Sequence, residues 1–419
     1  MIKRGLLCRK NTTLILGLVF FIFHAKITRT CNATPAVFDV TKFGAKGNGK
    51  PEYNEDGESS IGMAFIHAWL KACNSLGPST VVIPKGTYVV AQVMFTGPCQ
   101  SSVTVDLQGN IVADPDVSQF PNNELLVFSQ VEGSKLIGVG SIDATRPSSM
   151  VTPLDLEKPF LYSELMPSVS LLNVTKFEMS GVKSVNPEAF HVLVDSSREV
   201  SITNVNFEAT NLKPITRSDA IFISMSNSVK ITNSNIKTGD ACVTVSGGSK
   251  DVYITGVTCV NGKGIRVGAQ PHVTPDYNIN KVEVKNCTFK GTTYAATINP
   301  RPQEALGQVS DIIFQDLVMQ GVQTPIFIKQ DYLSTSGKSH VAKINNVHFK
   351  NIKGTTTTKD ALSISCSKTT PCDGIEVGDV DLKFTGNTLQ NLKDALTFSA
   401  TCLNAKVAFT GKHDGLSCL

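Results

Sequence analysis

The chain has 419 residues, of which 41% are hydrophobic, and its formal net charge is +4. This length and hydrophobic content suffice for a large core and would allow two or three domains. Six basic and no acidic residues fall within residues 1–30, so the rest of the chain has 33 basic and 35 acidic residues. That balance gives no sign of the clustered basic face of a nucleic-acid-binding protein.

The N-terminal segment has the pattern of a secretory signal. Four basic residues precede an apolar run, Leu14–Phe23, that is about half as long as a membrane-spanning helix. We therefore expect residues 1–30 to be a signal peptide, cleaved between Ala25 and Thr30, although a signal anchor is the alternative. No later apolar segment approaches membrane length, so residues 31–419 would be secreted and free of the membrane.

The first elements of the predicted mature chain are irregular. Phe38–Val40 is predicted as a short strand before a glycine-rich turn, and Val81–Tyr88 as a strand broken by a turn. Between them, Ser60–Cys73 is predicted as an amphipathic helix that could cap one end of a longer structure. Its apolar residues at helical spacing are Ile61, Phe65, Ala68, Trp69 and Ala72.

From about residue 100 a strand pattern recurs. In each copy, two apolar residues are separated by one position. Asn or a small turn residue follows two positions after the second of them. A second apolar strand precedes most copies, and successive copies lie 23 to 35 residues apart. The copies run through Val200, Ile202 and Asn204; Val229, Ile231 and Asn233; Val252, Ile254 and Gly256; Val282, Val284 and Asn286; Ile312, Phe314 and Asp316; and Val347, Phe349 and Asn351.

This repeat predicts an all-β solenoid. Each turn of chain is too small to bury its own apolar residues, so successive coils stack and share one interior. Asn suits a fixed corner because it tolerates left-handed backbone. A β-sandwich would instead place turn signals about every 8–12 residues. We expect one domain over residues 31–419, a right-handed parallel β-helix with an N-terminal capping helix.

The cysteines agree with export. Ten of the eleven lie beyond the apolar run, and none forms the Cys-x-x-Cys grouping of a zinc site, so disulfides are the better interpretation. Cys31 and Cys287 are left over, and acceptor sequons at Asn32, Asn173 and Asn286 fit a secreted glycoprotein. The candidate pairs are Cys242 with Cys259, Cys366 with Cys372, Cys402 with Cys418 and, less closely spaced, Cys73 with Cys99.

Two acidic residues mark the candidate site. Asp219 and Asp240 are 21 residues apart and Lys263 follows 23 later, each just before a second-strand segment. Stacked coils would bring the three together on one outer face, with Thr297 and Asn299 one coil further. Two carboxylates on such a face suit glycoside hydrolysis, in which one acid protonates the leaving oxygen and a base activates water. Taken alone, without the surrounding motif, the two Asp residues would be interpreted as turn residues that bond local backbone.

At these segments the chain resembles the plant polygalacturonases of glycoside hydrolase family 28. That family reads Asn-Thr-Asp-Gly, Gly-Asp-Asp-Cys, Gly-His-Gly and Arg-Ile-Lys at the four positions. The surrounding residues, including Gln330-Asp331-Tyr332, also fit, and the four cysteine pairs match the family's usual bridges. The corresponding segments in this chain are Arg217–Ala220, Gly239–Cys242, Gly262–Gly264 and Thr297–Asn299.

The resemblance implies an inverting hydrolase of α-1,4-galacturonan, the pectin backbone, located in the cell wall and needing no cofactor or metal. It implies that Asp240 is the proton donor and that Asp219 and the position of Ala241 hold the water. Lys263 stands at the histidine position. The Arg and Lys that grip the substrate carboxylate are replaced by Thr297 and Asn299, and Tyr332 matches a tyrosine near the cleaved bond.

These departures predict weak or absent hydrolysis. Losing one acid or base costs on the order of 10²–10⁴ in rate. A nearby ammonium at Lys263 would also favour the ionised form of Asp240, which makes it a poorer acid. Lys263 is either a solvated side chain or a new grip on a sugar carboxylate, and Asn299 and Tyr332 are further candidate substrate contacts.

The sequence leaves three hypotheses for the whole protein. The first is a monomeric wall protein that binds a pectic or related chain and whose catalysis is lost or impaired. The second is an active hydrolase that uses Asp219 and Asp240, and the third is a wall protein that binds another protein through the face of the solenoid. His191, His272 and His348 have no ligand partner at metal spacing, so none is expected to bind a metal.

Overall fold

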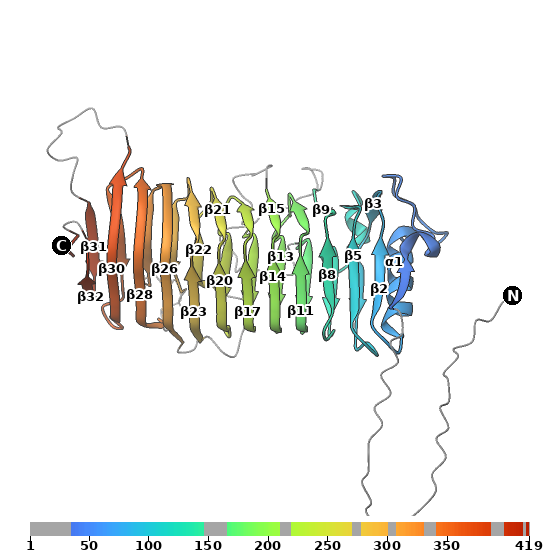
Figure 1. Ribbon diagram of the computed structural model, residues 1–419, viewed down its shortest axis with the longest axis horizontal. Coiled ribbons are helices and arrows are strands. Elements are labelled where there is room, and N and C mark those ends of the chain that lie inside the picture. Colours follow the sequence, from blue (N-terminus) through green and yellow to red (C-terminus); the bar gives the residue numbers. More distant parts are fainter. Residues whose placement is uncertain are drawn as a thin grey trace, which may run out of the picture. The chain divides into compact units, whose positions relative to one another are not determined.

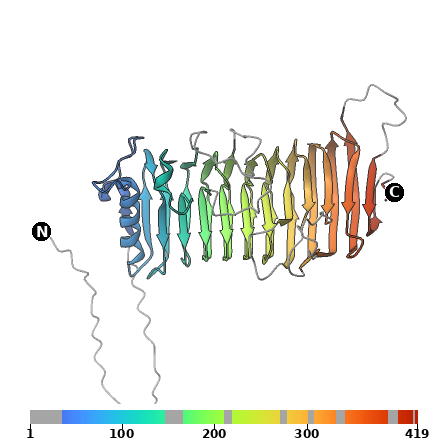
Figure 2. The ribbon, with the colours of Figure 1, turned by 180° about the vertical axis from the view of Figure 1, so that it is seen from behind.

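The computed structural model describes residues 35–145, 166–209, 219–269, 278–300, 307–330, 341–386, 398–413 and 416–418. These residues form a right-handed parallel β-helix, which confirms the predicted fold class. Successive coils lie side by side along the stack, from β1 and β2 at one end to β32 at the other (Figures 1 and 2). The predicted signal peptide lies outside the described residues. No helix of the described part has the length and hydropathy of a membrane span.

Each coil contributes one strand to an 11-stranded parallel sheet and, in most coils, two strands to a 21-stranded one. The smaller sheet consists of β4 (Val93–Thr96), β7 (Leu126–Ser129), β10 (Val169–Leu172), β13 (Val192–Asp195), β16 (Ile221–Ser224), β19 (Val243–Ser246), β22 (Ile265–Ala269), β25 (Tyr294–Ile298), β27 (Thr324–Lys329), β29 (Asp360–Ser365) and β31 (Ser399–Leu403). This sheet carries the candidate site.

The larger sheet wraps the rest of each coil. Its strands are β1 (Ala36–Asp39), β2 (Ser79–Ile83), β3 (Thr87–Val90), β5 (Val103–Leu107), β6 (Asn110–Ala113), β8 (Lys135–Gly138), β9 (Ser141–Asp143), β11 (Thr175–Ser180), β12 (Lys183–Val185), β14 (Arg198–Thr203), β15 (Asn206–Glu208), β17 (Asn227–Thr232), β18 (Asn235–Lys237), β20 (Lys250–Thr255), β21 (Thr258–Val260), β23 (Ile279–Lys285), β24 (Thr288–Lys290), β26 (Gln308–Val322), β28 (Lys343–Thr356), β30 (Cys372–Phe384) and β32 (Ala405–Thr410).

One α-helix is present in the described part of the chain, and its bounds match the prediction. Helix α1 (Ser60–Cys73) begins after Ser59, whose hydroxyl accepts a hydrogen bond from the Gly62 N–H at 3.2 Å. It covers the β2 end of the stack (Figure 1). Trp69 is buried against Phe95, with ring centroids 4.9 Å apart, so the helix closes the core at that end. Two short 3-10 helices, η1 (Val40–Phe43) and η2 (Val117–Gln119), complete the fold.

The interior is one apolar column, as the repeat predicts. In most strands of the larger sheet alternate residues are buried, and like residues stack from coil to coil, for example Phe314 on Phe349 with ring centroids 5.4 Å apart. The predicted corners are confirmed too, because Asn204, Asn233 and Asn286 all have φ near +50°. Left-handed backbone at these corners lets each coil turn without disturbing the next.

All four candidate cysteine pairs form disulfides, namely Cys73–Cys99, Cys242–Cys259, Cys366–Cys372 and Cys402–Cys418. Cys287 is free and buried, and burial raises the pKa of its thiol to about 11. The other leftover cysteine, Cys31, lies outside the described residues. The sequon residues Asn173 and Asn286 are exposed, whereas Asn32 also lies outside the described part. Glycosylation stays a prediction.

Candidate active site

Parallel register places four residues in one column beside the smaller sheet. Strands β16, β19, β22 and β25 pair in register through Ile221, Val243, Ile265 and Ala296. Asp219, Ala241, Lys263 and Tyr294 each lie two residues before those positions, so they follow one another from coil to coil. Stacked strands are about 4.8 Å apart, which puts consecutive members of the column within side-chain reach.

A second row lies on the outer face of the same strands. Register pairs Phe222 with Thr244, Thr244 with Arg266, Arg266 with Thr297, and Thr297 with Phe327. Their strand neighbours on either side are buried in the core. Side chains alternate across a strand, so these five face outward beside the column of Asp219 and Lys263.

Arg266 joins the two candidate carboxylates. Its Nη2 lies 2.7 Å from Oδ1 of Asp240 and its Nη1 lies 3.6 Å from Oδ1 of Asp219. All three side chains are largely buried, so the guanidinium and both carboxylates interact where water screens them little. Sequence analysis missed Arg266. The available signal was its place at the outward position of Ile265–Val267, directly after the glycine pair.

Asp219 is held by neutral donors as well. Its Oδ1 accepts the backbone N–H of Ala241 at 3.0 Å and its Oδ2 accepts the hydroxyl of Thr244 at 2.9 Å. Burial nevertheless raises the pKa of Asp219 to about 6, against the opposing attraction of Arg266, and the neighbouring charge of Asp240 adds to the rise. Asp219 therefore titrates close to the pH at which many general acids and bases work.

Asp240 has the opposite behaviour. Burial alone would raise its pKa, but the Arg266 guanidinium and the Lys263 ammonium together hold the pKa of this carboxyl below its usual range. Lys263 Nζ lies 3.2 Å from Oδ1 of Asp240, and the lysine side chain is 48% exposed. Lys263 therefore contacts Asp240 while remaining half exposed, and its role in binding a sugar carboxylate stays a prediction. It is the second cation on Asp240, whose carboxylate is kept ionised.

Close packing fixes this arrangement. A Cβ on Gly262 would lie 2.1 Å from the carbonyl oxygen of Asp240, and one on Gly264 would lie 2.4 Å from that of Tyr294. Both glycines also have positive φ, at 65° and 72°. Ala241 is fully buried, with its methyl group where the expected second acid of the pair would stand. Among the described residues, the site therefore holds two acids, Asp219 and Asp240, rather than three.

Comparison with known proteins identifies the family. Residues 73–403 match the family described as Glycosyl hydrolases family 28. The chain belongs to this family. It is 36% identical over 384 residues to the exopolygalacturonase clone GBGE184 of Arabidopsis thaliana, covering 91% of this chain and 87% of that relative. It is 32% identical over 406 residues to a polygalacturonase of Gossypium barbadense, covering 96% and 94%.

Two solved structures show the same fold. One is the exopolygalacturonase of Thermotoga maritima, with a TM-score of 0.67 at 15% identity, covering 83% of this chain and 87% of that one. The other is the endo-xylogalacturonan hydrolase of Aspergillus tubingensis, with a TM-score of 0.69 at 20% identity, covering 91% and 100%. The suspected kinship with plant polygalacturonases is confirmed.

Not every predicted position of this family 28 chain can be placed. Asp219, Asp240 and Lys263 come together, and Thr297 lies one coil from Arg266. Asn299 follows β25, and its backbone N–H donates to the carbonyl of Val267 at 2.8 Å. Tyr332 and the first two residues of the Arg217–Ala220 segment lie outside the described residues. The catalytic and binding roles of all these residues stay predictions.

The described histidines make local contacts. His191 is buried, bonds Ser184 at 2.8 Å and stacks on Phe207, and burial lowers its pKa to about 3. His348 bonds Glu376 at 2.6 Å. His272 lies outside the described part. Within the described ranges, no group of three or more His, Cys, Asp or Glu residues could hold a metal ion. The expectation of a cofactor-free protein is not tested by these contacts.

Replacing Asp219 with Asn should stabilise the protein above pH 6. A carboxyl whose folded pKa is raised binds more protons in the folded state, so its contribution to stability falls as pH rises from about 4 through 6. Asp219→Asn should therefore increase the free energy of unfolding by roughly 1–3 kcal/mol at pH 7.5, and by little at pH 4. Urea unfolding at both pH values measures this.

Asp240→Asn is the matched control for that experiment. Its carboxyl has a lowered pKa, so it contributes stability above about pH 4 that is lost on acidification. This variant should lose stability at pH 7.5 and approach the wild type as the pH falls. If both variants shift stability in the same direction at pH 7.5, the assignment of opposite charge states is wrong.

Proposed function

We propose that this protein is an exported cell-wall protein that binds pectic galacturonan along the outer face of the β-helix and hydrolyses it weakly or not at all. Membership of family 28 supports a pectic ligand. The signal-like N-terminal sequence and the four disulfides support export. We further propose that it acts as a monomer.

The ion pair between Arg266 and Asp240 is the main observation in support of weak or absent hydrolysis. Inverting glycosidases need one carboxylic acid that is protonated when the leaving oxygen departs. Asp240, at the donor position, is instead ionised, with Arg266 at 2.7 Å and Lys263 at 3.2 Å. A carboxylate held between two cations is a poor proton donor. The buried Ala241 methyl also leaves Asp219 as the one acid of the described residues that could hold water beside Asp240, so donor and base are both weakened.

One observation favours the alternative, an active hydrolase. Asp219 has its pKa raised to about 6 by burial, a value suited to a general acid near neutral pH. Asp219 would then donate the proton and ionised Asp240 would activate water, the reverse of the roles that the resemblance implies. This arrangement needs the Asp240 carboxylate to leave Arg266 far enough to accept a proton from water.

Calorimetric titration with pectic oligosaccharides, followed by mass spectrometry of the recovered sugars, tests the proposal. The expected result is saturable binding with the oligosaccharides recovered at their original length. Shortened products would favour the active hydrolase. Absence of binding to oligosaccharides of every degree of esterification would contradict the proposal and leave the protein-binding hypothesis.

A further inference from the structure

Within the part of the chain that the structure describes, the outer row carries little positive charge with which to hold an acidic polymer. In its described part, from Leu193 to Phe327, Arg266 is the one cationic residue, and it is ion-paired to two acids. Lys263 beside the row is paired as well. Among the described residues, the centre formed by Asp219, Asp240, Lys263 and Arg266 has two cations against two acids, and a bare galacturonan carboxylate would compete with Asp240 for both cations.

An aromatic surface lies immediately beyond this centre. The rings of Tyr294 and Phe327 stack with centroids 4.2 Å apart and planes 20° apart, and both side chains are half-buried. Tyr294 continues the column of Lys263, and Phe327 continues the row of Arg266. The face of an aromatic ring is electron-rich, so it favours the C–H groups of a sugar or a methyl ester and disfavours a carboxylate.

Thr297 offers a hydrogen bond at the same place. The residue is 2% exposed and lies in register between Arg266 and Phe327, and its hydroxyl has no hydrogen-bond partner among the described residues. A buried hydroxyl is seldom left unpaired in a native protein. A neutral ester carbonyl could accept this hydrogen bond without the cost of burying a charge.

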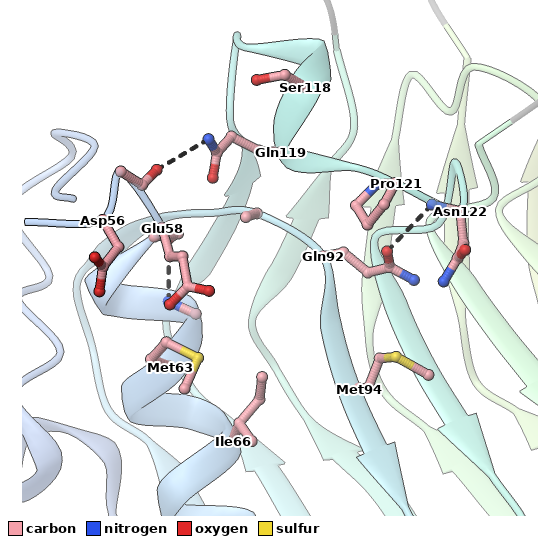
Figure 3. A pocket seen from close by; sticks show the side chains of 14 residues that line it. Asp56, Glu58, Met63, Ile66, Gln92, Met94, Ser118, Gln119, Pro121 and Asn122 are labelled. Atoms are coloured by element: carbon pink, nitrogen blue, oxygen red, sulfur yellow. Dashed lines mark hydrogen bonds between the residues drawn. The ribbon is translucent and has the colours of Figure 1, made fainter. Parts of the chain in front are cut away.

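The end of the outer row nearest α1 is also unfavourable for an anionic ligand. Met94 of β4 begins the outer row, which continues through Val127 and Ser170. A pocket of about 510 Å³ opens beside Met94, between the start of α1 and residues 117–122 (Figure 3). Its described lining residues include the carboxylates of Asp56 and Glu58 and no Lys, Arg or His. Such a volume suits a sugar unit, and the carboxylates would repel a galacturonate.

We propose that the ligand of this face is methyl-esterified galacturonan rather than the free acid, an inference that rests on the proposed pectin-binding function. Esterified sugars would stack on Tyr294 and Phe327 and accept a hydrogen bond from Thr297. A longer chain would run across the ion-paired centre toward the pocket beside Met94. The substitutions at positions 297 and 299 then change which pectin is bound, as well as weakening catalysis.

Titration of the mature protein with galacturonan oligosaccharides of one length, either fully methyl-esterified or unesterified, tests this inference at fixed ionic strength. The esterified oligosaccharide should bind at least tenfold more tightly. Equal or tighter binding of the unesterified one would overturn the inference while leaving pectin binding intact. Binding of neither would overturn the proposed function itself, so the two failures are distinguishable.

Substitutions test whether Tyr294, Phe327 and Thr297 cause the preference for the esterified oligosaccharide. Tyr294→Ala combined with Phe327→Ala should reduce the affinity for the esterified oligosaccharide at least tenfold, and Thr297→Val should reduce it severalfold. The matched control is Thr401→Val, the same change in the same outer row three coils away. Circular dichroism and the unfolding midpoint check that each variant folds. Folded variants with wild-type affinity would overturn the assignment.

Discussion

Five substitutions should together raise the rate of polygalacturonate hydrolysis by at least about 10³-fold. They rebuild the missing acid, the histidine and the carboxylate grip, and they remove the guanidinium that holds Asp240 ionised. Each acid or base contributes on the order of 10²–10⁴ in rate, and effects at one site do not simply add, so the expectation is a lower bound. The substitutions are Ala241→Asp, Lys263→His, Arg266→Ser, Thr297→Arg and Asn299→Lys.

The control is a variant that carries the other four substitutions and retains Arg266. Reducing-end release by the two variants is measured on unesterified polygalacturonate. The version that keeps Arg266 should be at least tenfold slower, because its guanidinium still lies 2.7 Å from Asp240. Equal rates would mean that Arg266 does not limit proton donation. No gain in either variant would mean that the site has changed at more positions than these five.

Removing the Arg266 side-chain charge should strongly destabilise the wild-type fold. Arg266→Met leaves Asp219 without a cationic partner and Asp240 with only the half-exposed Lys263. Removing one partner from a buried ion pair typically costs about 3–5 kcal/mol. We expect a loss of that order in the free energy of unfolding at pH 7.5, measured by urea denaturation.

Two further variants show whether buried charge causes that loss. Arg266→Met combined with Asp219→Asn should recover part of the lost stability, because one unpaired carboxylate is gone. Arg198→Met is the exposed control, since the Arg198 side chain is 61% exposed and its pair with Glu199 is worth about 0–1 kcal/mol. A loss for Arg266→Met as small as that of the control would contradict the picture of a charge-balanced buried triad.

The β-helix could be predicted because its information is local and repeated. The Val229, Ile231, Asn233 pattern sets two inward side chains and one left-handed corner, and each copy specifies the same geometry. The helix Ser60–Cys73 could also be predicted, because its apolar residues recur with a period of about 3.6 residues. Once coils stack in register, Asp219 and Lys263 must lie close together, so the position of the site also followed from sequence.

The charge state of the site could not be predicted, because it depends on contacts between coils. Arg266 stands in an ordinary strand pattern, and nothing in Ile265–Val267 shows that its long side chain reaches Asp240 26 residues earlier. The Tyr294–Phe327 stack and the pocket beside Met94 likewise join residues from different coils. Such contacts depend on register and side-chain reach, which spacing alone leaves open.

The most direct test of the account compares reducing-end release by the unmodified protein and by Asp240→Asn, on unesterified and methyl-esterified galacturonan. If Arg266 and Lys263 keep Asp240 from donating a proton, the two proteins should have the same rate, at or near the level without protein, on both polymers. Rapid release by the unmodified protein that Asp240→Asn abolishes would show that Asp240 works as an acid or base, and would contradict the account.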